Sequence, residues 1–270
     1  MEKKDKHSAP RPAPRSDVAG VGRDADAVPA VGGRNAVREL LASGRDIDKI
    51  FVATGEREGS IRTLIAEARA RKIPLVEVDS RRLDALVGHT RHQGIAAMAA
   101  MTEYCEVEDI LAIARERGEA PFIVIADGLE DPHNLGAIIR TAECCGAHGL
   151  ILQKRHSVGV TPVVAKASAG AVAHLAIARV SNLACTVDEL KKAGIWIYAA
   201  DMGGKSYREI DFSGPCALVM GSEGEGISRL VREKCDFVAS IPIYGRVNSM
   251  NVSAAAAVLL SEIAAAHHKS

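Results

Sequence analysis

The sequence predicts an α/β protein whose larger part is a mainly parallel β-sheet with helices on both faces. Three observations predict this fold class. Residues 122–126 form a continuous apolar run, as expected for a strand that is buried on both faces of a parallel sheet. Similar runs alternate with helix-like segments to the end of the chain. Polar loops follow several of these runs, at the sheet edge where such folds bind ligands.

The first 120 residues divide into three segments. Residues 1–29 are rich in Pro, Ala and charge and lack apolar periodicity, so we expect disorder. Residues 30–101 predict a small α/β sandwich, and the acidic residues 102–120 predict a linker with a helix. The elements expected in the sandwich are helices around 37–41, 60–71 and 81–87 and strands at 50–53, 75–78 and 94–100.

Residues 121–270 predict the larger unit. Its helices carry apolar side chains at helical spacing, as in Leu135, Ile138, Ile139 and Ala142. The expected strands are 122–126, 149–152, 175–180, 195–200, 217–220 and 237–243. The expected helices are 135–145, 162–171, 183–193, 227–234 and 252–267.

Composition limits the class of protein. The 270 residues hold 34 Lys and Arg against 34 Asp and Glu, and no run reaches the roughly 18 apolar residues of a membrane span. The charged N-terminus lacks the apolar segment of a secretory signal. The six cysteines have neither zinc-site nor disulfide-framework spacing. We therefore expect a cytoplasmic protein with no membrane association and no metal.

Positive charge is concentrated in the N-terminal part, where residues 30–101 hold 12 Lys and Arg against 9 Asp and Glu. A solvated helix face and a phosphate-binding patch both explain this excess. The cationic residues are Arg34, Arg38, Arg62, Arg69, Arg71, Lys72, Arg81, Arg82 and Arg91.

The glycine-rich loop at residues 221–226 reads G-x-x-G-x-G, which is not the G-x-G-x-x-G spacing of dinucleotide-binding folds. Near Gly204 and Lys205 only half of a phosphate-binding P-loop is present, because Ala199 replaces the first glycine. Lys205 is thus expected in a solvated turn. The spacing argues against ordinary NAD or FAD binding and against a kinase or NTPase.

Three loops at one sheet edge present polar side chains: Asn134 with Arg140, then Glu223, then Ser249 with Asn251. Asn134, Ser249 and Asn251 could each cap a helix instead, and Glu223 could have a structural role in which the dipole at a helix N-terminus stabilises its charge. Arg140 interrupts an apolar series, which suits a phosphate clamp, although an ion pair with a nearby carboxylate explains it too.

These loops resemble the SpoU (TrmH) branch of the SPOUT RNA methyltransferases. Residues 127–142 (D-G-L-E-D-P-H-N-L-G-A-I-I-R-T-A), 218–227 (L-V-M-G-S-E-G-E-G-I) and 241–253 (I-P-I-Y-G-R-V-N-S-M-N-V-S) match its three motifs in order and spacing. The resemblance covers essentially all of 121–268. Residues 32–37 and 92–97 look like the ends of the family's L30e-like substrate-binding domain, which brings the chain near the RlmB-like group that methylates guanosine in 23S rRNA.

The resemblance implies a C-terminal parallel-sheet domain with a deep trefoil knot, preceded by the L30e-like domain. It implies S-adenosylmethionine (SAM) as the cofactor, contacted by Gly221, Ile241 and Met250, and a homodimer with its active site at the subunit interface. The residues that match the family's functional set are Asn134, Arg140, Glu223, Ser249 and Asn251.

The implied reaction is methyl transfer to a ribose 2′-hydroxyl, in which the protein mainly positions the two reactants. Arg140 is expected to clamp a phosphate and to stabilise the developing oxyanion, because a guanidinium stays protonated and makes a poor base. The alternatives are a tRNA guanosine 2′-O-methyltransferase, a resistance-type rRNA adenosine methyltransferase, and a non-catalytic RNA-binding assembly factor.

Overall fold

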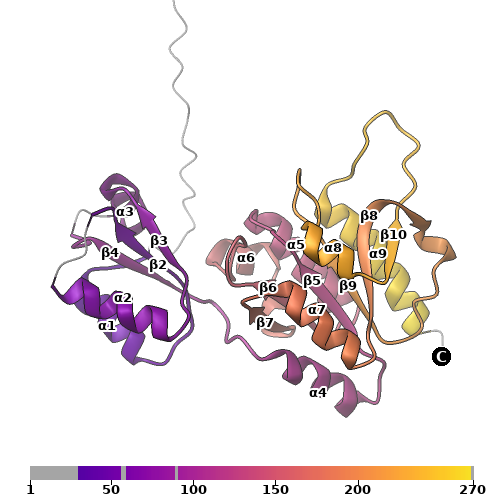
Figure 1. Cartoon of the computed structure of the whole chain (residues 1–270), viewed down its shortest axis with the longest axis horizontal. Coiled ribbons are helices and arrows are strands. Elements are labelled where there is room, and N and C mark those ends of the chain that lie inside the picture. The colour runs from indigo at the N-terminus through magenta and orange to yellow at the C-terminus, as the bar shows by residue number, and fades with distance from the viewer. Residues whose placement is uncertain (1–29, 56–58, 89–90, 269–270) are drawn as a thin grey trace, which may run out of the picture.

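The computed structural model describes residues 30–55, 59–88 and 91–268 (Figure 1). The disorder that we expect for residues 1–29 lies outside these ranges. Two separate sheets organise the described residues, one in each half of the chain, and both halves are of the α/β class that the sequence predicts.

The N-terminal half contains a four-stranded sheet in the order β1-β4-β2-β3. Only β2 and β3 are parallel, because β4 pairs antiparallel with both β1 and β2. Helices α1 and α2 pack on one face, and α3 packs on the other. The elements are β1 (Val31–Gly32), α1 (Arg34–Ala42), β2 (Ile47–Ala53), α2 (Ser60–Ala70), β3 (Leu75–Val78), α3 (Ser80–Val87) and β4 (Ile95–Ala99). This is the expected sandwich, with the addition of β1, which is too short to show a periodicity.

The C-terminal half contains a six-stranded sheet in the order β10-β8-β9-β5-β6-β7, and every neighbouring pair is parallel. All five residues of β5 are buried, in agreement with the expectation for a central strand. The strands are β5 (Phe122–Ala126), β6 (Gly149–Gln153), β7 (Ala176–Val180), β8 (Trp196–Ser206), β9 (Cys216–Met220) and β10 (Phe237–Ser240).

Helices cover both faces of this sheet, and each face has its own apolar core. Helices α5, α6 and α9 pack on one face, together with a 3₁₀ turn at Ala171–Ala173. Helices α4, α7 and α8 pack on the other face. Their bounds are α4 (Val107–Arg117), α5 (Pro132–Cys144), α6 (Pro162–Ala167), α7 (Leu183–Lys192), α8 (Arg229–Lys234) and α9 (Val252–His267). No helix among the described residues has the length and apolar character needed to cross a bilayer.

Several element boundaries differ from the expected ones. Helix α6 ends four residues early, because Ala169 (φ 50°) and Gly170 (φ 91°) take left-handed conformations. Strand β10 ends at Ser240, just before Pro242, which has no N–H to donate. The turn expected at Lys205 is wrong, because β8 continues to Ser206 and pairs with β10 across a register shift.

His148 joins the beginnings of strands β5 and β6. Its Nδ1 accepts a hydrogen bond from the Phe122 N–H at 3.0 Å, and its Nε2 lies 3.0 Å from a Glu119 carboxylate oxygen. Burial lowers the pKa of this imidazole below its usual 6.5, in spite of the Glu119 carboxylate. The hydrogen bond from Phe122 likewise favours the neutral ring, since a proton on Nδ1 would remove the acceptor.

A pH dependence of stability follows. The unfolded chain binds a proton at His148 more readily than the folded chain does, so the free energy of unfolding should fall as the pH drops below about 6.5. Chemical denaturation at pH 7.5 and 5.5 measures this loss. His148→Gln keeps a hydrogen-bond acceptor but cannot titrate, so its loss should be smaller. An unchanged pH dependence in this variant would contradict the assignment.

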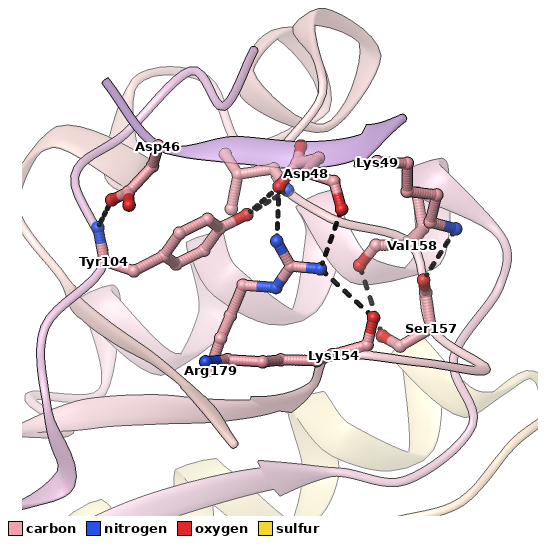
Figure 2. A network of polar contacts seen from close by, with 9 residues as sticks. Asp46, Asp48, Lys49, Tyr104, Lys154, Ser157, Val158 and Arg179 are labelled. Atoms are coloured by element: carbon pink, nitrogen blue, oxygen red, sulfur yellow. Dashed lines mark hydrogen bonds and ion pairs between the residues drawn. The ribbon is translucent and has the colours of Figure 1, made fainter. Parts of the chain in front are cut away.

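A buried ion pair joins the two halves of the molecule (Figure 2). Asp48 of β2 and Arg179 of β7 lie 2.8 Å apart, and their side chains are 1% and 5% exposed. Tyr104, in the connecting segment, donates its hydroxyl to the same Asp48 oxygen at 2.6 Å. The Arg179 guanidinium lies 4.8 Å from the centre of the Tyr104 ring. Asp48, Tyr104 and Arg179 are called the interdomain cluster below.

The loop after β6, residues 154–160, lies beside the interdomain cluster (Figure 2). Lys49 Nζ donates to the Ser157 carbonyl at 3.1 Å, and the Met101 N–H donates to the Val160 carbonyl at 3.0 Å. On its other side the loop is tied to the segment after β5, through a 2.8 Å hydrogen bond from the Val158 N–H to the Leu129 carbonyl. Docking of the N-terminal half thus also holds a loop at the carboxyl edge of the larger sheet.

Candidate functional site

A cavity of about 610 Å³ opens at the carboxyl ends of β9 and β10, beside the middle of β8. The glycine-rich loop forms one wall, and residues 248–252 form another. We call it the loop cavity. Gly221, Ile241 and Met250, which the resemblance marks for cofactor contact, all line it. The structure therefore brings these three positions together from two distant parts of the chain.

Gly221 allows the glycine-rich loop to close on itself. A Cβ at this position would lie 2.2 Å from the Gly226 carbonyl carbon, well inside van der Waals contact. Ser222 and Gly226 exchange backbone hydrogen bonds of 3.0 and 3.1 Å across the loop. Gly224 and Gly226 have φ of 100° and 71°, which favour glycine. The glycine spacing therefore follows from the shape of this loop.

Gly221→Ala should accordingly disrupt the loop cavity. The backbone must shift to admit the methyl group, so we expect a loss of about 1–3 kcal/mol in the free energy of unfolding and loss of ligand binding in the cavity. Gly214→Ala is the matched control, because a Cβ there meets nothing within 4 Å. Thermal denaturation and calorimetric titration with SAM measure both effects. Normal SAM affinity in Gly221→Ala would contradict this role.

A second cavity of about 1030 Å³ adjoins the first. We call it the strand-end cavity, because it is lined by residues that follow the carboxyl ends of β5, β6 and β7. Ser222, Glu223 and Gly226 line both cavities, so the glycine-rich loop is their common wall. Two adjacent cavities allow two reactants to meet at this edge of the sheet.

Asn251, Asn134 and Glu223 meet at the junction of the two cavities. The Asn251 Nδ2 donates to Asn134 Oδ1 at 3.0 Å and to Glu223 Oε1 at 2.5 Å. Its Oδ1 accepts from the backbone N–H groups of Ser253 and Ala254 at 3.0 and 3.2 Å. The Asn251 amide is therefore fully used in joining the three loops. Asn134 Nδ2 and Glu223 Oε2 have no hydrogen-bond partner among the described residues.

The capping alternatives are resolved differently for the two asparagines. Asn251 is the N-cap of α9, in agreement with the capping interpretation, and it also makes the contacts above. The N-cap interpretation of Asn134 is wrong, because Asp131 caps α5 and Pro132 opens it. Aspartate followed by proline is a typical helix start, so the sequence could have predicted that α5 begins at Pro132.

Ser249 lines the loop cavity, whereas Arg140 lines neither cavity. Arg140 lies on α5 with an exposed side chain, and it forms no ion pair with any residue that the structure describes. The surface ion pair offered as an alternative for Arg140 is therefore absent from the described residues. A cation without such a partner is available for an external anion.

The sequence interpretation overlooked Asp127, which follows β5 directly. Its side chain is buried, with 4% of the residue exposed, and its Oδ2 accepts from the Ser228 N–H at 2.7 Å. Its own N–H donates to the Met220 carbonyl at 2.9 Å. Asp127 thus fixes both ends of the glycine-rich loop. A carboxylate immediately after a wholly apolar strand was the signal that could have found it.

The site can position reactants and place polar groups beside them. No cysteine lines either cavity. Within the described part of the chain, no group of three or more His, Cys, Asp or Glu side chains is arranged to hold a metal ion. The groups that line the two cavities are amides, several carboxylates, serine hydroxyls, the imidazole of His156, the guanidinium groups of Arg229 and Arg232, and the backbone of the glycine-rich loop.

Known protein families match this chain over both halves. The SpoU rRNA Methylase family matches residues 121–261, and the family described as RNA 2′-O ribose methyltransferase substrate binding matches residues 30–105. YacO of Bacillus subtilis, assigned to the TrmH family of tRNA/rRNA methyltransferases, is 45% identical over 86% of this chain and 93% of its own length. A TrmH family relative from Staphylococcus haemolyticus is 43% identical over 88% of this chain and 95% of its own length.

Solved structures agree with these matches. The SpoU methyltransferase AviRb from Streptomyces viridochromogenes, in complex with AdoMet (SAM), has a TM-score of 0.55 and 26% identity and covers 87% of this chain and 88% of its own. An AdoMet-bound rRNA methyltransferase from Sinorhizobium meliloti has a TM-score of 0.56 and 27% identity and covers 89% and 87%. Both structures span the two halves of the molecule.

Proposed function

Because the chain belongs to the SpoU/TrmH family of RNA methyltransferases, we propose that this SAM-dependent enzyme methylates the ribose 2′-hydroxyl of a guanosine in 23S ribosomal RNA. The observation that carries the proposal is the junction of the two cavities, where Asn134, Glu223 and Asn251 meet. A methyl donor in one cavity and a ribose in the other would share that junction.

The loop cavity fits SAM. Its volume of about 610 Å³ lies within the roughly 300–1,000 Å³ of typical small-molecule sites. Ile241, Met250 and Leu259 supply apolar surface, and Gly221 brings the loop backbone close to the cavity. When bound, SAM would supply an electrophilic methyl group on a sulfonium. We assign Gly221, Ile241 and Met250 to its binding.

The protein would act by orienting the ribose and by helping its 2′-hydroxyl to lose a proton. Asn134 Nδ2 would donate a hydrogen bond to a ribose oxygen in the strand-end cavity, and Glu223 Oε2 would accept one from a ribose hydroxyl. Neither atom has a hydrogen-bond partner among the described residues. Asn251 would hold both side chains in place. The proton of the 2′-hydroxyl would leave to solvent through Ser249, which lines the loop cavity, or through water. Positioning of this kind can contribute about 7–11 kcal/mol.

We further propose a homodimer in which Arg140 binds the phosphate beside the target ribose. Exposed apolar side chains are Met202 at 60%, which lines the loop cavity, and Tyr244 at 94% and Val247 at 71%, which lie in the chain between its lining residues Ile243 and Asn248. Burial of these side chains by a second copy would close the cavity mouth. Light scattering after size exclusion tests the dimer, and Tyr244→Asp with Val247→Asp should shift the mass toward a monomer. The family's trefoil knot stays a prediction of the resemblance.

An rRNA target is favoured over tRNA by the N-terminal half. We propose that residues 30–101 are the RNA-binding unit, 102–120 the linker and 121–270 the catalytic unit. The similar Sinorhizobium meliloti protein, described as an rRNA methyltransferase, covers both units. The cytoplasm is the proposed location, because all six cysteines are free thiols and the proposed substrate is ribosomal RNA.

Methyl incorporation tests the function. Ribosomal RNA from a strain that lacks the enzyme should accept label from radioactive SAM, at one guanosine that ribose-methylation mapping identifies. A synthetic fragment with 2′-deoxyguanosine at that position should accept none. Label on the deoxy fragment would refute the 2′-oxygen as acceptor. Label on tRNA alone would favour the tRNA methyltransferase, and normal SAM binding without label on either RNA would favour the assembly factor.

A further inference from the structure

A cleft of about 850 Å³ lies between the two halves of the molecule. One wall comes from β2, α2, β3 and the turn between α2 and β3. The other comes from residues 154 and 155, which follow β6, and from Ser181, which follows β7. We call it the interdomain cleft. It is separate from the loop cavity, with which it shares no residue.

The interdomain cleft is strongly basic. Five cations line it, three from the N-terminal half and two from the C-terminal half, and Glu77 is the one carboxylate in its lining. None of the five cationic side chains forms an ion pair with a described residue. They are Arg62, Arg69, Lys72, Lys154 and Arg155. Three of these cations belong to the nine for which the sequence allowed either a solvated face or a phosphate-binding patch. In the fold they line a concave site, where charges of one sign concentrate the electrostatic field.

Residues that line the interdomain cleft are next in sequence to residues that line the strand-end cavity. Lys154 and Arg155 line the cleft, whereas their neighbours Gln153 and His156 line the cavity. His156 has a left-handed φ of 55°, so the chain bends sharply there. Ser181 lines the cleft, and residues 182–184 line the cavity. Two short segments of chain thus contribute to both the basic surface and the proposed ribose site.

The interdomain cluster keeps the two walls together. Arg179 Nη2 approaches the Lys154 carbonyl at 3.3 Å, and Arg179 Nη1 donates to Asp48 at 2.8 Å. The cluster thus links β2 of one wall directly to the first residue of the loop in the other wall (Figure 2). Both side chains of the pair are buried, so this contact joins the two walls out of reach of solvent.

We propose that the interdomain cleft binds the phosphate backbone of the RNA whose ribose occupies the strand-end cavity. This inference rests on the proposed function. Arg62, Arg69 and Lys72 would hold phosphates on the N-terminal wall, and Lys154 and Arg155 would hold those nearest the target nucleotide. The cleft would set the register of the strand by phosphate contacts, without reading bases.

A charge reversal on each wall tests the proposal. Arg69→Glu with Arg155→Glu should raise the Kd for the transcribed rRNA fragment roughly tenfold at ~0.1 M salt and flatten the slope of log Kd against log salt by about 2. The KM for RNA should rise, whereas the Kd for SAM and kcat at saturating RNA should stay unchanged. The matched control is Arg115→Glu with Lys192→Glu, which changes the net charge equally on exposed residues outside the cleft and outside residues 30–101. It should stay within about twofold of the native enzyme.

An unchanged Kd in the cleft variant, or an equal loss in the control, would overturn the proposal. Failure of the proposed function is a different result, because the native enzyme itself would then leave rRNA unlabelled. If it methylates tRNA instead, the same variants and salt series are measured on that tRNA. The cleft proposal is then decided by the difference in Kd for that tRNA between the cleft variant and the control.

Discussion

Arg140→Ala is expected to bind SAM normally and to lose on the order of 10²–10³-fold in kcat. The side chain lies exposed on α5, lines neither cavity and has no ion-pair partner among the described residues, so its removal should leave the fold and the loop cavity intact. The loss would then report only the contact with the RNA. Single-turnover methylation at saturating RNA and calorimetric titration with SAM separate the two quantities.

Arg140→Lys distinguishes a clamp from a base. Lysine keeps the charge but lacks the planar fork that binds phosphate through two hydrogen bonds, and it can lose a proton within an accessible pH range. A clamp predicts that most of kcat is lost with no new step in the pH profile. Retention of most of kcat with a shifted profile would contradict the clamp and support a base. Arg115→Ala, an exposed arginine on α4, is the control and should leave kcat unchanged.

Arg179→Met should destabilise the protein by about 3–5 kcal/mol, because it leaves the Asp48 carboxylate buried without its cation. Asp48 Oδ2 already has no hydrogen-bond partner in the described structure. Burial raises the pKa of Asp48, and Arg179 and Tyr104 oppose this rise. Without Arg179 the pKa should rise further, so the folded variant takes up a proton more readily than its unfolded chain. The destabilisation should therefore shrink between pH 7.5 and pH 5.5, which chemical denaturation measures.

Two further variants make this prediction specific. Asp48→Leu with Arg179→Met removes both charges and should recover most of the lost stability, as replaced buried pairs often do. Lys234→Met removes a half-exposed pair with Asp188, whose side chains are 35% and 43% exposed. It should cost less than about 1 kcal/mol. An equal loss in Arg179→Met and Lys234→Met would show that the interdomain cluster contributes no more than a surface pair.

Local signals were sufficient for most of the fold. The apolar run at 122–126 predicted a central strand, and α9 begins and ends where its apolar pattern does, at Val252 and His267. The errors occur where a local feature competed with the pattern. The left-handed residues Ala169 and Gly170 shortened α6. Asp131 and Pro132 moved the start of α5 three residues earlier than the apolar series indicated.

The sequence by itself determined the class of fold, the family and the polar residues at the sheet edge, because each depends on residues that are close together in the chain. Only the tertiary structure decided which of those residues meet. Asn134 and Asn251 are 117 positions apart, and Asp48 and Arg179 are 131 apart. Such contacts depend on strand order and domain docking, which no local periodicity encodes. The same reason explains why the sequence could not show that Arg69 and Arg155 share one cleft.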